Sequence, residues 1–261
     1  MLVDFRGTEY HLCRPSLPTA GWGFPAFSTP HPDADSVCSL INEPTRDEGD
    51  PLVTMPSQFE KQSYWQRRFA SETSFEWLTS STAFMEVICS YLEHLPGSTK
   101  ILHLGSGTSD LHTRLRQHGF FDVTNMDYEP LALARGQQLE NDRFGNVQTK
   151  YVVADATRLD VGEKYGLVID KSTADAIACG ADDAVFSMAK GICRSLDDNG
   201  FWISLSYSPC RFEHVQSLFN VEVISKLPTP KHKSTDPDIF HYCYLLRPRE
   251  QLSRPAKMAS R

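Results

Sequence analysis

Long apolar segments are absent from this sequence of 261 residues. A membrane-spanning helix needs about 20 consecutive, mostly apolar residues, and no such run occurs here. The first residues, MLVDFRGTEYHLCRP, also lack the basic start and apolar centre of a secretory signal peptide. We therefore expect a protein that is neither secreted nor inserted into a membrane, and we expect it in the cytoplasm.

Signatures of metal sites and disulfide frameworks are also missing. The seven cysteines form an odd set, and none of them stand at the C-x-x-C spacing of zinc sites. The nine histidines are scattered, and no H-E-x-x-H segment occurs. Reduced thiols fit a cytosolic or nuclear protein, and the sequence predicts no metal site.

Basic residues are too few for a surface that binds nucleic acid. Lysine and arginine number 26 against 33 aspartates and glutamates, which gives a net charge of −7. A surface that binds phosphate backbones normally carries a basic face. We expect no nucleic-acid partner, and the composition gives no indication of the oligomeric state.

The chain is long enough for one substantial domain with irregular ends. Residues 1–56 contain eight of the sixteen prolines and show no helical or strand period, which predicts an irregular N-terminal extension. Its aromatic residues could pack against the domain, or it could be a mobile leader. The domain is expected at 57–247, and a basic, solvated tail at 248–261.

Short apolar segments alternate with helical ones along this domain. A long amphipathic helix is expected to start at Phe75 and to stop at Pro96-Gly97. The last two strands are joined by a Pro/Lys-rich loop, which suits an antiparallel pair. The sequence predicts an α/β, Rossmann-like seven-strand sheet, mostly parallel with an antiparallel last strand and with helices on both faces. The expected strands are 100–104, 122–126, 151–154, 167–169, 201–205, 221–227 and 240–246.

Glycine or acidic residues follow the first two strands, where an open parallel sheet binds its ligands. Gly105 and Gly107 would let backbone amides approach a ligand, although such turns also serve only to pack a strand against a helix. Asp127 ends the second strand, about 20 residues further on, where a carboxylate can accept hydrogen bonds from both ribose hydroxyls. The adjacent Tyr128 could cover one face of an adenine.

The third and fourth strands are also followed by aspartates. Asp155 and Ala156 could offer a carboxylate and an N–H to an adenine edge, although an aspartate at this place is also common as a helix cap or turn residue. After the fourth strand, Asp170 and Asp175 are candidate catalytic residues that could orient an acceptor or help to remove a proton. Either could equally be a cap or an ion-pair partner of Lys171.

A nicotinamide-dependent dehydrogenase would use a similar glycine turn and acid. The turn here reads G-S-G-T-S-D and lacks the third glycine of G-x-G-x-x-G. The aspartate after the third strand suits an adenine contact, and the sheet is expected to end in an antiparallel pair. These features disfavour the dehydrogenase.

The combination of five segments resembles a known family. These are residues 64–69 (YWQRRF), 75–77 (FEW), 101–111 (ILHLGSGTSDL), 123–128 (VTNMDY) and 168–176 (VIDKSTADA). Together they resemble the class I, seven-strand S-adenosylmethionine-dependent methyltransferases. The resemblance, which extends from about residue 57 to residue 247, is to the group of translation-elongation-factor lysine methyltransferases and their endothelin-converting-enzyme-linked relatives.

This resemblance implies an enzyme with S-adenosylmethionine as its cofactor. It places Trp65, Phe69 and Trp77 over the cofactor, where the sequence alone would make them core aromatics. It also implies a cofactor pocket lined by Gly105, Asp127, Tyr128, Asp155, Ala156 and Lys171.

The departures from the family concern the methyl acceptor. The usual G-C-G is G-S-G here, K-G-T-L-D is K-S-T-A-D at 171–175, and P-H-F-R is P-C-R-F at 209–212. The resemblance implies a protein lysine as acceptor, with elongation factor 1A as the candidate protein. Alternatives are a small molecule methylated on N, O or S, and a non-catalytic cofactor-binding adaptor. We expect residues 1–56 to shape acceptor access.

Overall fold

The computed structural model describes residues 58–181, 183–231 and 233–249. These residues belong to one compact unit. The expected extension at 1–56 and nearly all of the expected tail at 248–261 lie outside the described residues. Within the described ranges, every helix is too short or too polar to cross a lipid bilayer.

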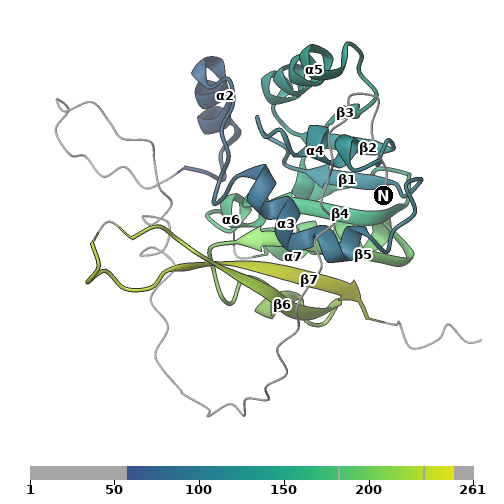
Figure 1. The fold of residues 1–261 in the computed structure, drawn as a ribbon. Coiled ribbons are helices and arrows are strands. Elements are labelled where there is room, and N and C mark those ends of the chain that lie inside the picture. Colours follow the sequence, from purple (N-terminus) through teal and green to yellow (C-terminus); the bar gives the residue numbers. More distant parts are fainter. Residues whose placement is uncertain (1–57, 182, 232, 250–261) are drawn as a thin grey trace, which may run out of the picture. The chain divides into compact units, whose positions relative to one another are not determined.

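A seven-stranded sheet with the order β3-β2-β1-β4-β5-β7-β6 organises these residues (Figure 1). The first five strands pair in parallel, and β7 runs antiparallel to both β5 and β6. This confirms the predicted fold class. The strands are β1 Ile101–Leu104, β2 Val123–Asp127, β3 Lys150–Val153, β4 Tyr165–Lys171, β5 Leu196–Ser206, β6 Phe219–Pro228 and β7 Phe240–Pro248.

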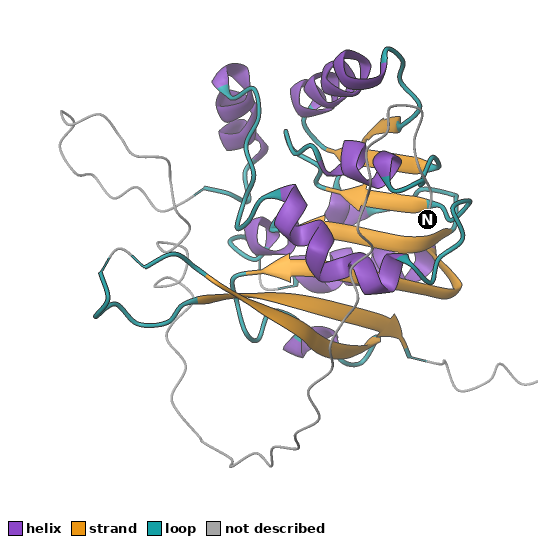
Figure 2. Cartoon of the chain, viewed as in Figure 1, coloured by secondary structure: helices purple, strands orange, loops and turns teal. Residues whose placement is uncertain are grey.

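Helices cover both faces of the sheet (Figure 2). Successive strand residues face opposite sides, so Ile101 packs with α3 and α4 on one face, and Leu102 packs with α7 on the other. Because both faces of β1 and β4 are buried, the sequences of these strands are nearly continuous apolar runs. The helices are α2 Gln62–Ser71, α3 Ser81–Leu92, α4 Leu111–Gln117, α5 Pro130–Phe144, α6 Thr173–Ile177 and α7 Ala184–Ser195, with short 3-10 turns η2 Ala156–Arg158 and η3 Glu213–Val215.

The predicted start of the helix before the sheet is wrong. The helix α3 begins at Ser81, because the Ser80 side chain caps it by accepting a hydrogen bond from the Ala83 N–H at 3.2 Å. Just before the cap, Leu78 adopts a φ of 65°, which no helix allows. The residues from Phe75 to Ser80 therefore form a loop, and this loop takes part in the site described below.

Trp202 is the largest fully buried side chain of the core, and it makes a hydrogen bond inside the core. Its indole Nε1 donates to Asp170 Oδ2 at 2.7 Å, and its ring contacts Phe212 and Phe219 edge-on. Burial raises the pKa of Asp170 to about 7, against the opposing effect of the hydrogen bond from Trp202. The hydrogen bond from Trp202 thus stabilises the ionised form of Asp170, which burial in the core disfavours.

We predict that Trp202→Phe lowers the free energy of unfolding by about 1–3 kcal/mol at pH 8, because it leaves a buried acceptor with one donor fewer. The folded pKa of Asp170 lies above its unfolded value, so this group costs stability as pH rises from about 4 toward 7. Loss of the donor raises that pKa further, and the effect of the substitution should shrink at pH 5. Urea unfolding at both pH values measures this. A loss of equal size at pH 5 and pH 8 would contradict it.

Candidate functional site

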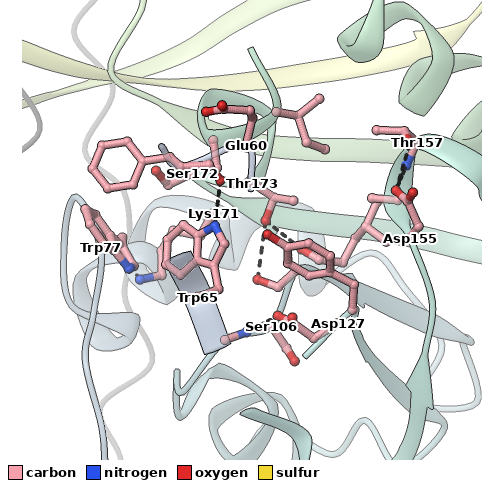
Figure 3. A pocket seen from close by; sticks show the side chains of 18 of the residues that line it. Glu60, Trp65, Trp77, Ser106, Asp127, Asp155, Thr157, Lys171, Ser172 and Thr173 are labelled. Atoms are coloured by element: carbon pink, nitrogen blue, oxygen red, sulfur yellow. Dashed lines mark hydrogen bonds between the residues drawn. The ribbon is translucent and has the colours of Figure 1, made fainter. Parts of the chain in front are cut away.

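A cavity of about 320 Å³ lies at the carboxyl ends of β1, β2 and β4. It is where a doubly wound sheet binds ligands, because the strand order reverses here: β1 leads to β2 and β3 on one side, and the connection from β3 then crosses to β4 on the other side of β1. Figure 3 shows side chains from the strand ends and from the segment before α3 around it. Every residue that the sequence indicated as cofactor-binding lines this cavity.

The glycine turn after β1 has a backbone that requires glycine. Gly105 and Gly107 have φ values of 61° and 51°, in the left-handed region. A Cβ on Gly105 would also lie 2.2 Å from Thr173 Oγ1, which donates to the Leu104 carbonyl at 3.0 Å. Between the glycines, the Ser106 Oγ is buried and has no hydrogen-bond partner among the described residues. The turn thus carries a buried, unpartnered hydroxyl on a residue that lines the cavity.

Asp127 connects the end of β2 to this turn. Its Oδ2 accepts from the Gly107 N–H at 2.8 Å, and its Oδ1 accepts from the Glu129 N–H at 3.0 Å. Burial raises the pKa of Asp127 to about 6, although both N–H groups oppose the shift. Each carboxylate oxygen keeps a second lone pair for a further donor. The adjacent Tyr128 is half-buried and accepts a hydrogen bond on its carbonyl from Gln62 Nε2 at 3.0 Å.

The aspartate after β3 both caps a turn and lines the cavity. Asp155 Oδ1 accepts from the N–H and the hydroxyl of Thr157 at 2.8 and 2.7 Å, which caps η2. Ala156 follows it at the cavity wall. The two interpretations of Asp155 from the sequence are therefore compatible.

Aromatic side chains from α2 and from the loop before α3 cover the cavity. Trp65 and Trp77 lie with ring centroids 5.7 Å apart, and Phe69 lies 5.5 Å from Trp65. The Trp65 Nε1 donates to the carbonyl of Phe59, whose ring contacts both tryptophans. The guanidinium of Arg68 lies 4.6 Å from the ring centroid of Trp77, in a cation–π contact. The tryptophans are thus parts of one packed group, which we call the aromatic cover.

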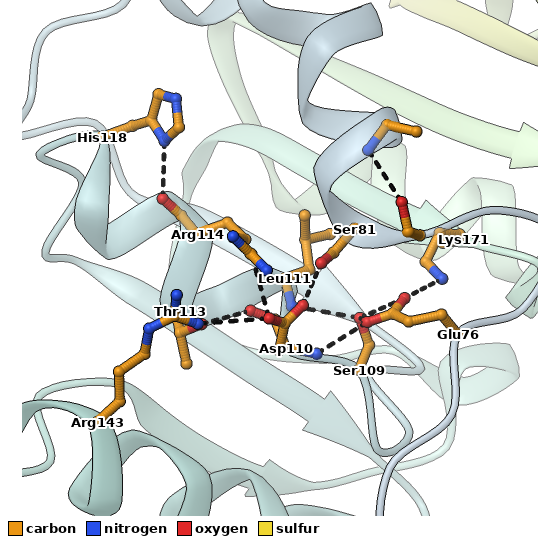
Figure 4. Close-up of polar contacts among 12 residues, drawn as sticks. Glu76, Ser81, Ser109, Asp110, Leu111, Thr113, Arg114, His118, Arg143 and Lys171 are labelled. Carbon is orange, nitrogen blue, oxygen red and sulfur yellow. Dashed lines mark hydrogen bonds and ion pairs between the residues drawn. The ribbon is translucent and has the colours of Figure 1, made fainter. Parts of the chain in front are cut away.

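Lys171 joins the end of β4 to this cover (Figure 4). Its ammonium donates to the Glu76 carboxylate and to the carbonyls of Trp77 and Thr79, the last two at 2.9 and 3.2 Å. Glu76 in turn accepts from the Ser109 hydroxyl at 2.8 Å. Burial lowers the pKa of Lys171, and the Glu76 charge opposes this. Since an ammonium has three hydrogens, these three acceptors use all of them.

The structure does not bring Asp170 and Asp175 to the cavity wall. Both side chains are fully buried, and Asp170 lies on the opposite face of β4 from its neighbour Lys171. Asp175 accepts from Arg211 at 2.8 Å and from the Ser206 hydroxyl at 2.5 Å. Its ion-pair partner is Arg211, and Lys171 pairs with Glu76 instead. This geometry favours a structural role for both aspartates over the catalytic one that the sequence suggested.

Several lining residues were not anticipated from the sequence, and three of them are Phe59, Glu60 and His103. Phe59 and Glu60 precede α2, and His103 lies within β1. Burial lowers the pKa of His103 to about 3, and its Nδ1 lies 3.2 Å from Asn125 Oδ1. A histidine inside the apolar run ILHL was the one available signal, whereas nothing in the pattern distinguished Glu60. The described residues contain no cluster of three or more His, Cys, Asp or Glu side chains that could hold a metal ion.

We predict that Lys171→Met loosens the aromatic cover and lowers the free energy of unfolding by about 2–3 kcal/mol, because it leaves the partly buried Glu76 carboxylate, 22% exposed, without its cation. Urea unfolding and acrylamide quenching of tryptophan fluorescence measure the two effects. Lys100→Met is the matched control, since the Lys100–Glu163 pair at 3.3 Å is about half exposed and worth at most about 1 kcal/mol. Equal behaviour of the two variants would show that the buried bridge does not hold the cover.

Comparison with known proteins places the chain in a family. No protein-family model matches it. It is 56% identical over 200 residues to methyltransferase srdJ of Neurospora crassa, an alignment that covers 74% of this chain and 86% of that protein. It is 29% identical over 143 residues to human EEF1A lysine methyltransferase 2, covering 52% of this chain and 60% of that protein. A Drosophila melanogaster homolog of the eEF1A lysine and N-terminal methyltransferase is 28% identical over 57% of this chain, which spans 22% of that protein.

Solved structures share the fold. The N-methyltransferase NodS from Bradyrhizobium japonicum, in complex with S-adenosylhomocysteine, matches with a TM-score of 0.56 and 12% identity over 74% of this chain and all of that one. The magnesium protoporphyrin IX methyltransferase of Synechocystis, with bound S-adenosylmethionine, matches with a TM-score of 0.51 and 14% identity over 72% and 93%. From its seven-strand sheet and its identity to methyltransferase srdJ, the chain belongs to the class I S-adenosylmethionine-dependent methyltransferases.

Proposed function

We propose that the cavity holds S-adenosylmethionine and that the chain transfers the methyl group of this cofactor to the side-chain nitrogen of a protein lysine. The observation that carries the cofactor site is the convergence of the glycine turn, Asp127, Asp155 and the aromatic cover on one cavity. In this proposal Asp127 accepts from the ribose hydroxyls, Tyr128 covers the adenine, and Asp155 with Ala156 meets its edge.

The charges of the cavity wall fit a cationic cofactor. Glu60, Asp127 and Asp155 are acidic lining residues, whereas Lys171, the basic lining residue among the described ones, is engaged with Glu76. A wall with excess negative charge attracts a ligand that carries a sulfonium cation. The unpartnered Ser106 hydroxyl offers a further polar contact to the ligand.

The chain's residues have to position and desolvate the reactants. The bound cofactor supplies a methyl group that is already activated as a sulfonium. Orientation of two reactants in near-attack geometry can lower a barrier by about 7–11 kcal/mol, more than a single acid–base contact gives. Trp65 and Trp77 line the cavity, and Lys171 donates to the Trp77 carbonyl. In this proposal the two rings shield the bound reactants from water.

The lysine acceptor rests on the relatives. Two of them are named as lysine methyltransferases of elongation factor 1A, at 28–29% identity over little more than half of this chain. The more similar srdJ is named as a methyltransferase without an acceptor. Methylation of a translation factor implies a cytoplasmic enzyme. The expected role of residues 1–56 in acceptor access concerns residues outside the described part and stays a prediction.

The acceptor is tested by incubating the protein with methyl-labelled S-adenosylmethionine, purified elongation factor 1A and, separately, fractionated host lysate. We expect label in elongation factor 1A and its loss when lysine amines are blocked by prior acetylation. Label that enters only the small-molecule fraction would overturn the lysine acceptor. It would favour the alternative, methylation of N, O or S on a metabolite.

The cofactor site is tested through Asp127. If its carboxylate accepts from ribose hydroxyls, ligand binding lowers the pKa from about 6, so the affinity for S-adenosylhomocysteine rises with pH and levels off above pH 6. Asp127→Asn should lower the affinity at pH 8 about tenfold or more and remove this pH dependence. Calorimetry from pH 5 to pH 8 measures both, with thermal unfolding as the folding control. Parallel pH profiles in the two proteins would exclude Asp127 from the site.

A further inference from the structure

Glu60 has a buried carboxylate oxygen that the described structure leaves without a partner. Its Oε2 is inaccessible to solvent and receives no hydrogen bond from the described residues, while the residue lines the cavity. A buried carboxylate oxygen without a donor is costly, more so than a neutral group. Glu60 as a whole is partly exposed and lines the cavity, so a ligand group in the cavity is a candidate partner for this carboxylate.

The segment that carries Glu60 crosses the cavity above the end of β1. On one side, Gln62 donates to the carbonyl of Tyr128, which follows β2. On the other, the Cβ and Cγ of Glu60 lie 3.1 and 3.3 Å from the place that a Cβ on Gly180 would take, beyond α6. Tyr128 follows β2, and Gly180 follows β4 and α6. Since β2 and β4 lie on opposite sides of β1, this segment spans the cavity, and Figure 3 shows Glu60 among the side chains that line it.

Two largely buried cations of the described residues around the cavity are engaged with other groups. Lys171 is held by Glu76, and Arg68 pairs with Glu72 at 2.6 Å while it covers Trp77. The aromatic ring of Phe59 lies next to Glu60 in the chain and 6.0 Å from Trp65. Glu60 lines the same cavity as Phe59, Trp65 and Trp77. A site that combines a carboxylate with aromatic rings binds ammonium groups, by charge-assisted hydrogen bonding and by cation–π attraction.

We propose that Glu60 forms, with the neighbouring aromatic cover, a subsite for an ammonium group, and that this group is the amine of the methyl acceptor. This inference rests on the proposed function. The ribose and adenine already have expected partners in Asp127 and Asp155, whereas Asp170 and Asp175 are buried away from the cavity. Glu60 is then the carboxylate that remains to orient a nitrogen acceptor and to favour it over a neutral oxygen or sulfur acceptor.

The α-ammonium of the cofactor's methionine part has the same chemistry, and the experiment separates the two sources. Wild type and Glu60→Gln are titrated calorimetrically with S-adenosylhomocysteine and with 5′-methylthioadenosine, which lacks the amino-acid part. The proteins saturated with S-adenosylhomocysteine are then titrated with Nα-acetyl-lysine methylamide and with Nα-acetyl-norleucine methylamide, which lacks the ammonium. Glu86→Gln, an exposed acid on α3, is the matched control.

We expect Glu60→Gln to weaken the lysine probe about tenfold or more, to leave the norleucine probe and both nucleosides unchanged, and to leave thermal stability near that of the control. Weaker binding of S-adenosylhomocysteine with unchanged methylthioadenosine would assign the subsite to the cofactor's ammonium and overturn the acceptor assignment. Unchanged affinity for all four ligands, or an equal loss for all four, would overturn the subsite. Wild-type protein that bound neither S-adenosylhomocysteine nor the lysine probe would refute the proposed function as well, which distinguishes the two failures.

Discussion

The buried ammonium of Lys171 is the interaction on which the site depends. A charge is buried at low cost only when it is paired and fully hydrogen-bonded, and Lys171 obtains its partners from residues 76–79. The carbonyls of Trp77 and Thr79 point at the ammonium, so these residues cannot continue α3 toward its N-terminus. The loop that results places Trp77 over the cavity. The strand-end lysine thus acts together with the Ser80 cap and the positive φ of Leu78 to keep these residues out of the helix, and it holds the loop over the cavity.

Glu76, the ion-pair partner of Lys171, and its neighbours in the chain also connect the cover to the glycine turn. Glu76 accepts from the Ser109 hydroxyl, and Glu72 accepts from the Thr108 hydroxyl at 2.8 Å. The Phe75 N–H donates to that Thr108 hydroxyl at 3.0 Å. The turn that approaches the ligand and the loop that covers it are therefore one hydrogen-bonded unit. A ligand between them contacts both, which limits how independently either can move.

The aspartates at the strand ends divide by the face on which they lie. Asp127 and Asp155 line the cavity with backbone donors on their carboxylates. Asp170 points into the core toward Trp202, and Asp175 is bound to Arg211. Similar positions in the sequence thus have different surroundings. For Asp170 and Lys171 the reason is that neighbouring residues of a strand face opposite sides, and Asp175 lies in α6, where it pairs with Arg211. The negative charge that remains in the cavity belongs to Glu60, Asp127 and Asp155.

The sequence by itself determined the sheet, the strand ends and the glycine turn. These follow from local pattern: apolar runs of strand length, a turn residue that tolerates positive φ at Gly105, and an acid at a fixed distance at Asp127. Only the tertiary structure decided which partners the charged side chains take. Lys171 meets Glu76 across 95 positions of the chain, and Glu60 reaches the cavity because its segment packs on Tyr128 and Gly180. Such contacts depend on how distant segments pack, and no periodicity within either segment encodes them.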